Sequence, residues 1–194
     1  MSRKFFLTPV HLVPALLLIF TLAGCGSVPP APADNFYRLQ TPAASATNLS
    51  VAVEIRRVQA DSLYAERPIV YSEAGNLRQL RQYHYHLWLY PPAQMLRDAL
   101  RSQLPTPATA SGKTVTLDAR IVAFDRVVSG SNSSAQAALE VTVTSGNQTL
   151  IEKRYQAEQA SSDATLTAFV VAMEGALGRI YAEVARDMAE KAAR

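Results

Sequence analysis

Cys25 is the residue whose surroundings point most directly to chemistry. It is the only cysteine of the chain, so it has no partner for an intramolecular disulfide. Leu22, Ala23 and Gly24 come directly before it, and small residues before a cysteine at the end of an apolar run are typical of a bacterial lipobox. The chemistry that this order predicts is cleavage before Cys25, with a diacylglyceryl group on the thiol and an acyl chain, such as palmitate, on the new amino group.

The segment in front of Cys25 has the layout of a signal peptide. Arg3 and Lys4 form a basic start, and an apolar run follows over residues 15–23. Two other interpretations are open: a transmembrane helix, which needs about 20 apolar residues, and an ordinary secretory signal in which Cys25 has no role. Proline and histidine interrupt the segment before residue 15, so the run has the length of a signal-peptide core, about 7–15 residues. We therefore expect residues 1–24 to be removed and Cys25 to be lipidated.

His84 and His86 are the other residues whose type and spacing could support chemistry, in this case metal binding. They alternate along an expected strand, so their side chains would point the same way and could hold one metal ion. A zinc site needs further ligands, and only scattered carboxylates remain, so we expect an exposed strand face and no metal site. The sequence contains no GxSxG, P-loop or GxGxxG motif. These absences predict a protein that is not an enzyme and has no cofactor beyond the covalent lipid on Cys25.

Aromatic residues gather just before an expected helix, and they are the candidate partner-binding residues. The four are Tyr83, Tyr85, Trp88 and Tyr90. Large aromatic side chains are enriched in binding hot spots. The same pattern is also typical of core packing, and the sequence leaves both interpretations open.

The elements that must position these residues follow from composition and hydrophobic periodicity. Residues 26–35 are rich in Pro and Ala and predict an extended tether of about 30 Å, at roughly 3.1 Å per residue. Period-two patterning predicts strands, over residues 36–39, 49–58, 67–71, 77–85, 113–124, 135–144 and 150–157. Short turns join the last three strands, which predicts an antiparallel meander.

Two helices complete the expected fold. Pro91 and Pro92 open a short helix, because proline is tolerated in the first turn. Asp163 is the expected N-cap of a long final helix that runs to about residue 191. Small residues between positions 171 and 189 either fill space or let another helix or subunit approach closely. The predicted fold class is α+β, with an antiparallel or mixed sheet packed on one face by a short central helix and a long C-terminal helix.

The length of the mature chain is that of a single domain, and its net charge is small. Removal of residues 1–24 leaves 170 residues, the size of one domain, and lowers the formal net charge from +3 to +1. Basic residues form no cluster, which excludes a nucleic-acid interface. The predicted organisation is a signal peptide over residues 1–24, lipidated Cys25 with its tether over residues 25–35, and one periplasmic α+β domain over residues 36–194.

A set of apolar and aromatic positions has a spacing that is shared with a known family. The positions are Phe36-Tyr37-Arg38-Leu39, Arg67-Pro68-Ile69-Val70-Tyr71, Leu77, Tyr83-x-Tyr85-x-x-Trp88, Pro91-Pro92, Met95-Leu96, Leu100 and Leu104. Together with the lipidated cysteine, they resemble the ABC-type transport auxiliary lipoproteins. The resemblance covers nearly the whole mature chain and depends on packing positions, not on reactive groups.

The resemblance implies a periplasm-facing lipoprotein of the outer membrane. Gly26, not an acidic residue, follows the cysteine, and similarity to other bacterial lipoproteins with this feature also implies sorting to the outer membrane. The role of the protein would be that of an adaptor, without ATPase activity, for an inner-membrane ABC transporter or an MCE-domain (mammalian cell entry) protein that moves phospholipid or other hydrophobic molecules. A homo-oligomeric ring is also implied. Two alternatives stay open: a lipid-binding carrier with an apolar cavity of about 300 Å³ or more, and an assembly lipoprotein of a lipopolysaccharide translocon or a secretin.

Overall fold

The computed structural model describes residues 30–40, 49, 51–105 and 113–192. The chain divides into two units, Met1–Ala33 and Asp34–Arg194. Of the first unit only residues 30–33 are described, and they are exposed and without regular structure. The predicted signal peptide, Cys25 and most of the predicted tether lie outside the described residues.

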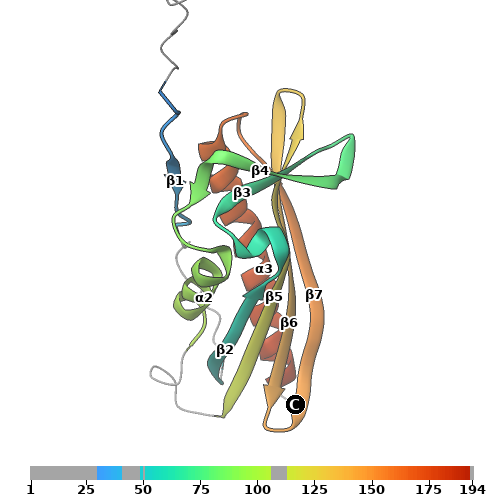
Figure 1. Cartoon of the computed structure of the whole chain (residues 1–194). Coiled ribbons are helices and arrows are strands. Elements are labelled where there is room, and N and C mark those ends of the chain that lie inside the picture. The colour runs from blue at the N-terminus through green and yellow to red at the C-terminus, as the bar shows by residue number, and fades with distance from the viewer. Residues whose placement is uncertain (1–29, 41–48, 50, 106–112, 193–194) are drawn as a thin grey trace, which may run out of the picture. The chain divides into compact units, whose positions relative to one another are not determined.

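A mixed sheet of seven strands forms the body of the second unit (Figure 1). The strands are β1 (Asn35–Tyr37), β2 (Ala52–Ala60), β3 (Pro68–Glu73), β4 (Asn76–Trp88), β5 (Thr114–Ser129), β6 (Asn132–Ser145) and β7 (Gln148–Ala160). Six of them lie in the order β1-β4-β3-β5-β6-β7, and β2 pairs with β5. The sheet is therefore organised around β5, which has three neighbours.

β5 has 16 residues, so it is long enough to pair with different strands along its length. On one side β6 lies antiparallel to residues 116–129. On the other side β2 pairs in parallel with residues 114–121 and β3 pairs in parallel with residues 125–128. The predicted meander of β5, β6 and β7 is confirmed. The parallel pairs, including β1 with β4, make the sheet mixed, not purely antiparallel.

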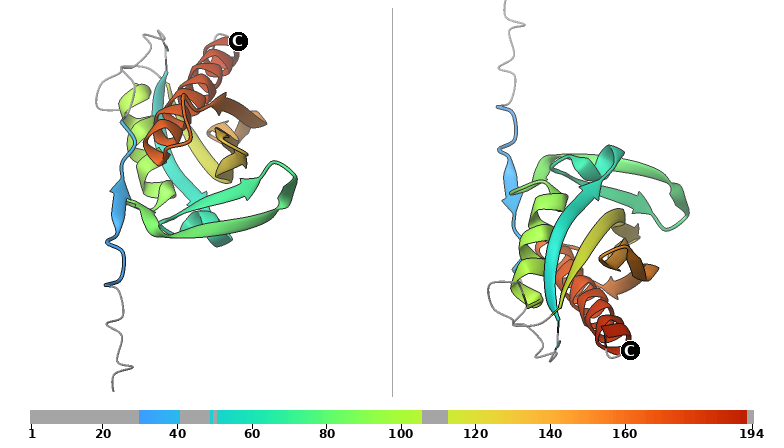
Figure 2. Two further views of the ribbon diagram at one scale, coloured as in Figure 1. Left: turned by 90° about the horizontal axis from the view of Figure 1, so that it is seen from above. Right: turned by 90° about the horizontal axis from the view of Figure 1, so that it is seen from below.

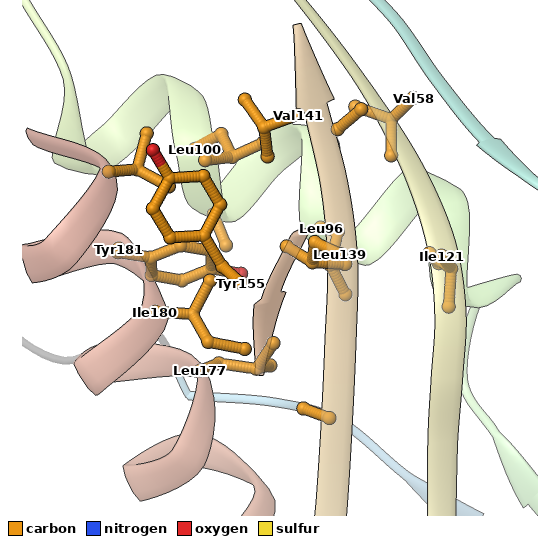
Figure 3. Packing of buried hydrophobic residues seen from close by; sticks show 14 of the residues in the cluster. Val58, Leu96, Leu100, Ile121, Leu139, Val141, Tyr155, Leu177, Ile180 and Tyr181 are labelled. Carbon is orange, nitrogen blue, oxygen red and sulfur yellow. The ribbon is translucent and has the colours of Figure 1, made fainter. Parts of the chain in front are cut away.

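Two helices, α2 (Pro92–Gln103) and α3 (Leu166–Ala192), pack on one face of the sheet (Figure 2). Both contribute to one hydrophobic core with the inward side chains of the strands. Figure 3 shows part of that core, with contributions from α2, β6 and α3: Leu96, Leu100, Leu139, Val141, Leu177, Ile180 and Tyr181. The predicted α+β class, with a short and a long helix on one face, is confirmed.

The start of α3 differs from the sequence prediction. Asp163 Oδ1 accepts a hydrogen bond from the main-chain N–H of Thr165 at 2.7 Å. Thr165 Oγ1 in turn accepts one from the N–H of Ala168, three residues further on, at 3.1 Å. The N-cap of a helix is the residue whose side-chain oxygen accepts a hydrogen bond from the main-chain N–H two or three residues later, at the start of the helix. Thr165 therefore caps the helix, and Asp163 orders the turn before it.

The small residues of α3 have a local structural use at Gly175. A methyl group on this glycine would lie 2.7 Å from Oε1 of Gln159 on β7. Glycine thus lets the helix and the edge strand of the same chain come close together. Val171, one turn earlier, is 61% exposed, so the described part of the chain does not cover it.

η3 (Ser62–Ala65), a single 3₁₀ turn between β2 and β3, lies against β5. Tyr64 of η3 donates a hydrogen bond from its hydroxyl to Asp125 Oδ1 at 2.8 Å. Asp125 is 3% exposed, and this burial raises the pKa of its carboxyl. Exposed ion pairs of the sheet, such as Arg120 of β5 with Glu140 of β6 at 2.7 Å, contribute little to stability.

Candidate functional site

The four candidate aromatic residues lie on β4 or directly after it. β4 is the return strand of the β3–β4 hairpin, which pairs antiparallel as the sequence predicts. Residues 73–81 of this hairpin are exposed, and β4 becomes fully buried only at Trp88. The candidate residues therefore span the change from surface to core, and they have different environments.

Trp88 belongs to the core. Its side chain is 1% exposed, and its ring centroid lies 5.2 Å from that of Phe124 and 5.9 Å from that of Phe169. Its main-chain N–H donates to the carbonyl of Arg67 at 2.7 Å, and Arg67 Nε donates back to its carbonyl at 3.0 Å. Trp88 thus fixes the end of β4 against β5 and α3, and its ring is not presented on the surface.

Tyr83 is half-buried and joins β4 to its neighbours. Its ring centroid lies 4.4 Å from that of Tyr71 on β3. Its hydroxyl accepts a hydrogen bond from Nη1 of Arg126 on β5 at 2.9 Å. The hydroxyl therefore has a structural partner inside the protein, and the ring packs against a second aromatic side chain.

Arg126 is a buried cation that the sequence analysis missed. It is 7% exposed, and its Nη2 also donates to Ser133 Oγ at 3.2 Å and to the carbonyl of Ala164 at 2.5 Å. No carboxylate of the described residues lies within ion-pair distance of it. Arg126 therefore ties β4, β6 and the segment before α3 to β5 through neutral oxygens. The signal that could have found it is the pair of adjacent charged residues, Asp125 and Arg126, within the otherwise apolar residues 121–128.

Tyr85 and Tyr90 form the exposed part of the cluster. They are 39% and 50% exposed, and Phe36 of β1 is 51% exposed. Phe36 is the Cα partner of Leu87 on β4, and the guanidinium carbon of Arg67 lies 5.1 Å from the centroid of its ring. These large side chains can contact a partner directly, which Trp88 cannot do.

The two histidines make separate contacts. His86 Nδ1 lies 3.0 Å from the hydroxyl of Tyr37 and shares a hydrogen bond with it. The ring of His84 lies beside that of Tyr85, with 6.3 Å between centroids. Within the ranges that the structure describes, no three His, Cys, Asp or Glu side chains are grouped so that they could hold a metal ion.

Two hollows bordered by described residues lie at opposite ends of the sheet. One of about 480 Å³ is bordered by the tips of the β3–β4 and β5–β6 hairpins and by Glu73 and Tyr83. Another of about 400 Å³ is bordered by Lys113 and Lys191. The apolar space under α3, around Val143 and Met188, has no room for a water molecule. Side chains thus fill the contact between helix and sheet at this place.

The family of the chain follows from a comparison with protein families. The model described as "ABC-type transport auxiliary lipoprotein component" matches residues 37–185, which is most of the chain. The chain belongs to the ABC-type transport auxiliary lipoprotein family, as the resemblance in its sequence predicts. The family description makes it a membrane-associated lipoprotein that is auxiliary to ABC-type transport.

Solved structures share the fold. A crystal structure of an uncharacterized protein has a TM-score of 0.66 at 15% identity, over 80% of this chain and 99% of the other. Protein XCC0632 from Xanthomonas campestris, of family DUF330, has a TM-score of 0.64 at 19% identity, over 77% and 92% of the two chains. At these identities the likeness is one of fold alone. No curated protein matches the chain.

None of the described helices combines the length and apolar character needed to cross a bilayer. Cys25 lies outside the described residues, so lipidation there remains a prediction from the sequence.

Proposed function

We propose that this chain is an outer-membrane lipoprotein that faces the periplasm and acts as a non-catalytic adaptor for an ABC transporter or an MCE-domain protein. The family match over residues 37–185 is the observation that carries this proposal. The lipid on Cys25 would hold the domain at the membrane, and stable anchoring needs two or more acyl chains. The transported molecule would be phospholipid or another hydrophobic compound.

The packing of the domain supports an adaptor over a lipid carrier. A carrier needs an apolar cavity of about 300 Å³ or more between the sheet and the helices. The two described hollows of that size carry charged side chains on their borders, Glu73 in one and Lys113 with Lys191 in the other. The described contact between α2, α3 and the sheet is filled by large apolar side chains (Figure 3). Such a domain offers its surface, not its interior, to another molecule.

The buried ionisable groups also support a role without catalysis. Asp125 is the one carboxylate that is fully buried among the described residues, and it is covered by Tyr64. Arg126 is bound by oxygens of Tyr83, Ser133 and Ala164. Both groups are used to connect elements of the fold, and neither borders the hollows described above.

The test is capture of the partner by the full lipidated chain. The tagged chain is cross-linked in living cells, purified from detergent-solubilised envelope, and compared by quantitative mass spectrometry with an unrelated tagged lipoprotein. The proposal predicts enrichment of an ABC or MCE component in every replicate. Enrichment of lipopolysaccharide-translocon or secretin components, or of no envelope protein, would contradict it.

Matched surface variants make this test specific for the exposed aromatic residues. Tyr85→Ser combined with Tyr90→Ser removes two large exposed side chains, and we expect it to lower recovery by at least about tenfold if they are hot spots. Val171→Ser on α3 removes a side chain that is also exposed, at 61%. Recovery with this control should stay within about twofold of the unchanged chain.

A further inference from the structure

The open sheet ends on one side at β7, and on the other side its outer strands are β2, beside the first half of β5, and β4 with β1, beyond β3. The β7 edge is guarded by charged side chains. Lys153 of β7 lies 2.9 Å from Glu183 and 2.8 Å from Asp187 on α3. Arg179 of α3 donates a hydrogen bond to the main-chain carbonyl of Glu158 on β7 at 2.6 Å. Charged side chains on an edge strand and occupied main-chain groups both hinder the addition of another strand.

Most of β4 also has a neighbouring strand on only one side. β1 pairs with three residues at its end, His86–Trp88. Over residues 76–85, β3 lies on the inner side, and no described strand or helix pairs with the outer side. One side-chain contact reaches this outer edge, from Asn35 Nδ2 to the carbonyl of Tyr85 at 3.4 Å. The hairpin that carries this edge stands out from the body of the sheet in Figure 1.

Residues 30–34, which come directly before β1, are poorly suited to extend it along this edge. β1 runs parallel to β4 with Asn35 opposite His86, so a longer β1 would place residues 30–34 beside residues 81–85. Pro30 and Pro32 fall in that segment and have no N–H to donate to a ladder. Residues 30–34 accordingly have no strand structure. β1 nevertheless shows that this side of β4 accepts a parallel strand.

The side chains of β4 define what the edge would bind. Its 13 residues include no Asp or Glu. Arg78 is exposed and has no ion-pair partner among the described residues, whereas Arg81 lies 3.1 Å from Glu73. Leu77 is 57% exposed and Leu80 is 36% exposed. An unpaired edge with exposed leucines is a template for strand addition, and its arginines would repel a basic segment and favour an acidic one.

We propose that the outer edge of β4, over residues 76–85, binds an extended acidic and apolar segment of the transport component as an added strand. Main-chain hydrogen bonds would supply affinity, and the side chains of the segment would give specificity, with one alternate set near Leu77 and the other near Arg78 and Leu80 on the opposite face. This inference rests on the proposed adaptor function and specifies the surface and the chemistry of its partner.

Hydrogen–deuterium exchange of the full lipidated chain in detergent, with and without the captured transport component, tests the inference. We expect amide exchange in residues 76–85 to slow by at least about tenfold in the complex, because added strands protect edge amides. Exchange in β7 should not change. Bound component with unchanged exchange in residues 76–85 would overturn the inference and leave the adaptor function standing. If no transport component is captured, both proposals are wrong.

The same measurement separates a transport partner from a second copy of this chain. If residues 76–85 are already protected in the chain alone, and more so at higher concentration, a second copy covers the edge and the inference is wrong. We expect exchange of these amides in the chain alone to be independent of concentration.

A pair of charge reversals tests the chemistry of the edge. Arg78→Glu on β4 and Arg154→Glu on β7 change exposed arginines in the same way. Reversal of charge opposite an acidic segment should weaken binding of the component by at least about tenfold for Arg78→Glu. Arg154→Glu should stay within about twofold. Equal effects of the two variants, with unchanged circular dichroism spectra, would overturn the assignment to β4.

Discussion

Replacement of Trp88 by alanine separates the core and interface interpretations of the aromatic cluster. Trp88 is 1% exposed and packs its ring against Phe124 and Phe169. Tyr90, two residues later, is 50% exposed. The two residues therefore have different roles: Trp88 contributes to stability, and the side chain of Tyr90 is exposed for binding.

The size of the effect follows from burial and ring contacts. Replacement of a fully buried tryptophan by alanine lowers the free energy of unfolding by about 3–5 kcal/mol, because buried apolar area is lost and a cavity remains. The two aromatic contacts place Trp88→Ala near the upper end, at about 4–5 kcal/mol. Domains of this size have a free energy of unfolding of about 5–15 kcal/mol, so the variant should be close to unfolding. Trp88→Phe keeps an aromatic ring and should lose only about 1–2 kcal/mol, whereas Tyr90→Ala should change stability by less than about 0.5 kcal/mol.

Urea unfolding followed by far-ultraviolet circular dichroism measures these differences without depending on Trp88 fluorescence. The urea concentration at the midpoint should be highest for Tyr90→Ala, lower for Trp88→Phe and lowest for Trp88→Ala. The dependence of the unfolding free energy on urea concentration should be similar for all three. A loss below about 1 kcal/mol for Trp88→Ala would show that its ring is not packed in the core.

Three further predictions concern single side chains. Tyr83→Phe removes the hydroxyl that accepts from buried Arg126, and urea unfolding should show a loss of about 1.5–3 kcal/mol; no loss would mean that this bond is not formed. Burial raises the pKa of Asp125 above its usual 3.8, so the unfolded chain ionises first and stability falls as pH rises above that value. Asp125→Asn should therefore be more stable than the unchanged chain at pH 7 and not at pH 3, and a constant difference in thermal melts would refute this. Gly130 has φ +58°, so Gly130→Ala should lose about 1–2 kcal/mol in urea unfolding, whereas Gly75→Ala, with open space around it, should not; equal losses would contradict the turn geometry.

Local elements of the fold could be predicted because their patterns are local. Period-two patterning in residues 113–157 gave the meander β5–β7, and short turns left little choice of neighbour. The helices likewise followed from helical spacing and from Pro92 at the first turn of α2. The parallel pairing of β2 and β3 with β5 could not be predicted, because partner choice between distant strands depends on packing of the whole sheet.

The site was predicted less completely than the fold. The cluster of aromatic residues was visible, but burial of Trp88 and exposure of Tyr90 depend on where β4 leaves the sheet. The register of β3 with β4 shifts between Pro68 and Val70, so simple alternation does not give the environment of each residue. Arg126 was missed because two of its three hydrogen-bond partners, Tyr83 and Ala164, are about 40 residues away in opposite directions along the chain, and nothing in the sequence places them together.

Lipidation of Cys25 is needed by every later step of the proposed function, and the mass and membrane location of the mature chain test it most directly. Intact-mass spectrometry of the chain from outer-membrane fractions should show a product that lacks residues 1–24 and carries diacylglyceryl and N-acyl groups on Cys25. Cys25→Ala should abolish this product and remove the chain from that fraction. An unmodified Cys25 in the mature chain, or an unchanged outer-membrane location of Cys25→Ala, would contradict the proposal of a lipid-anchored adaptor.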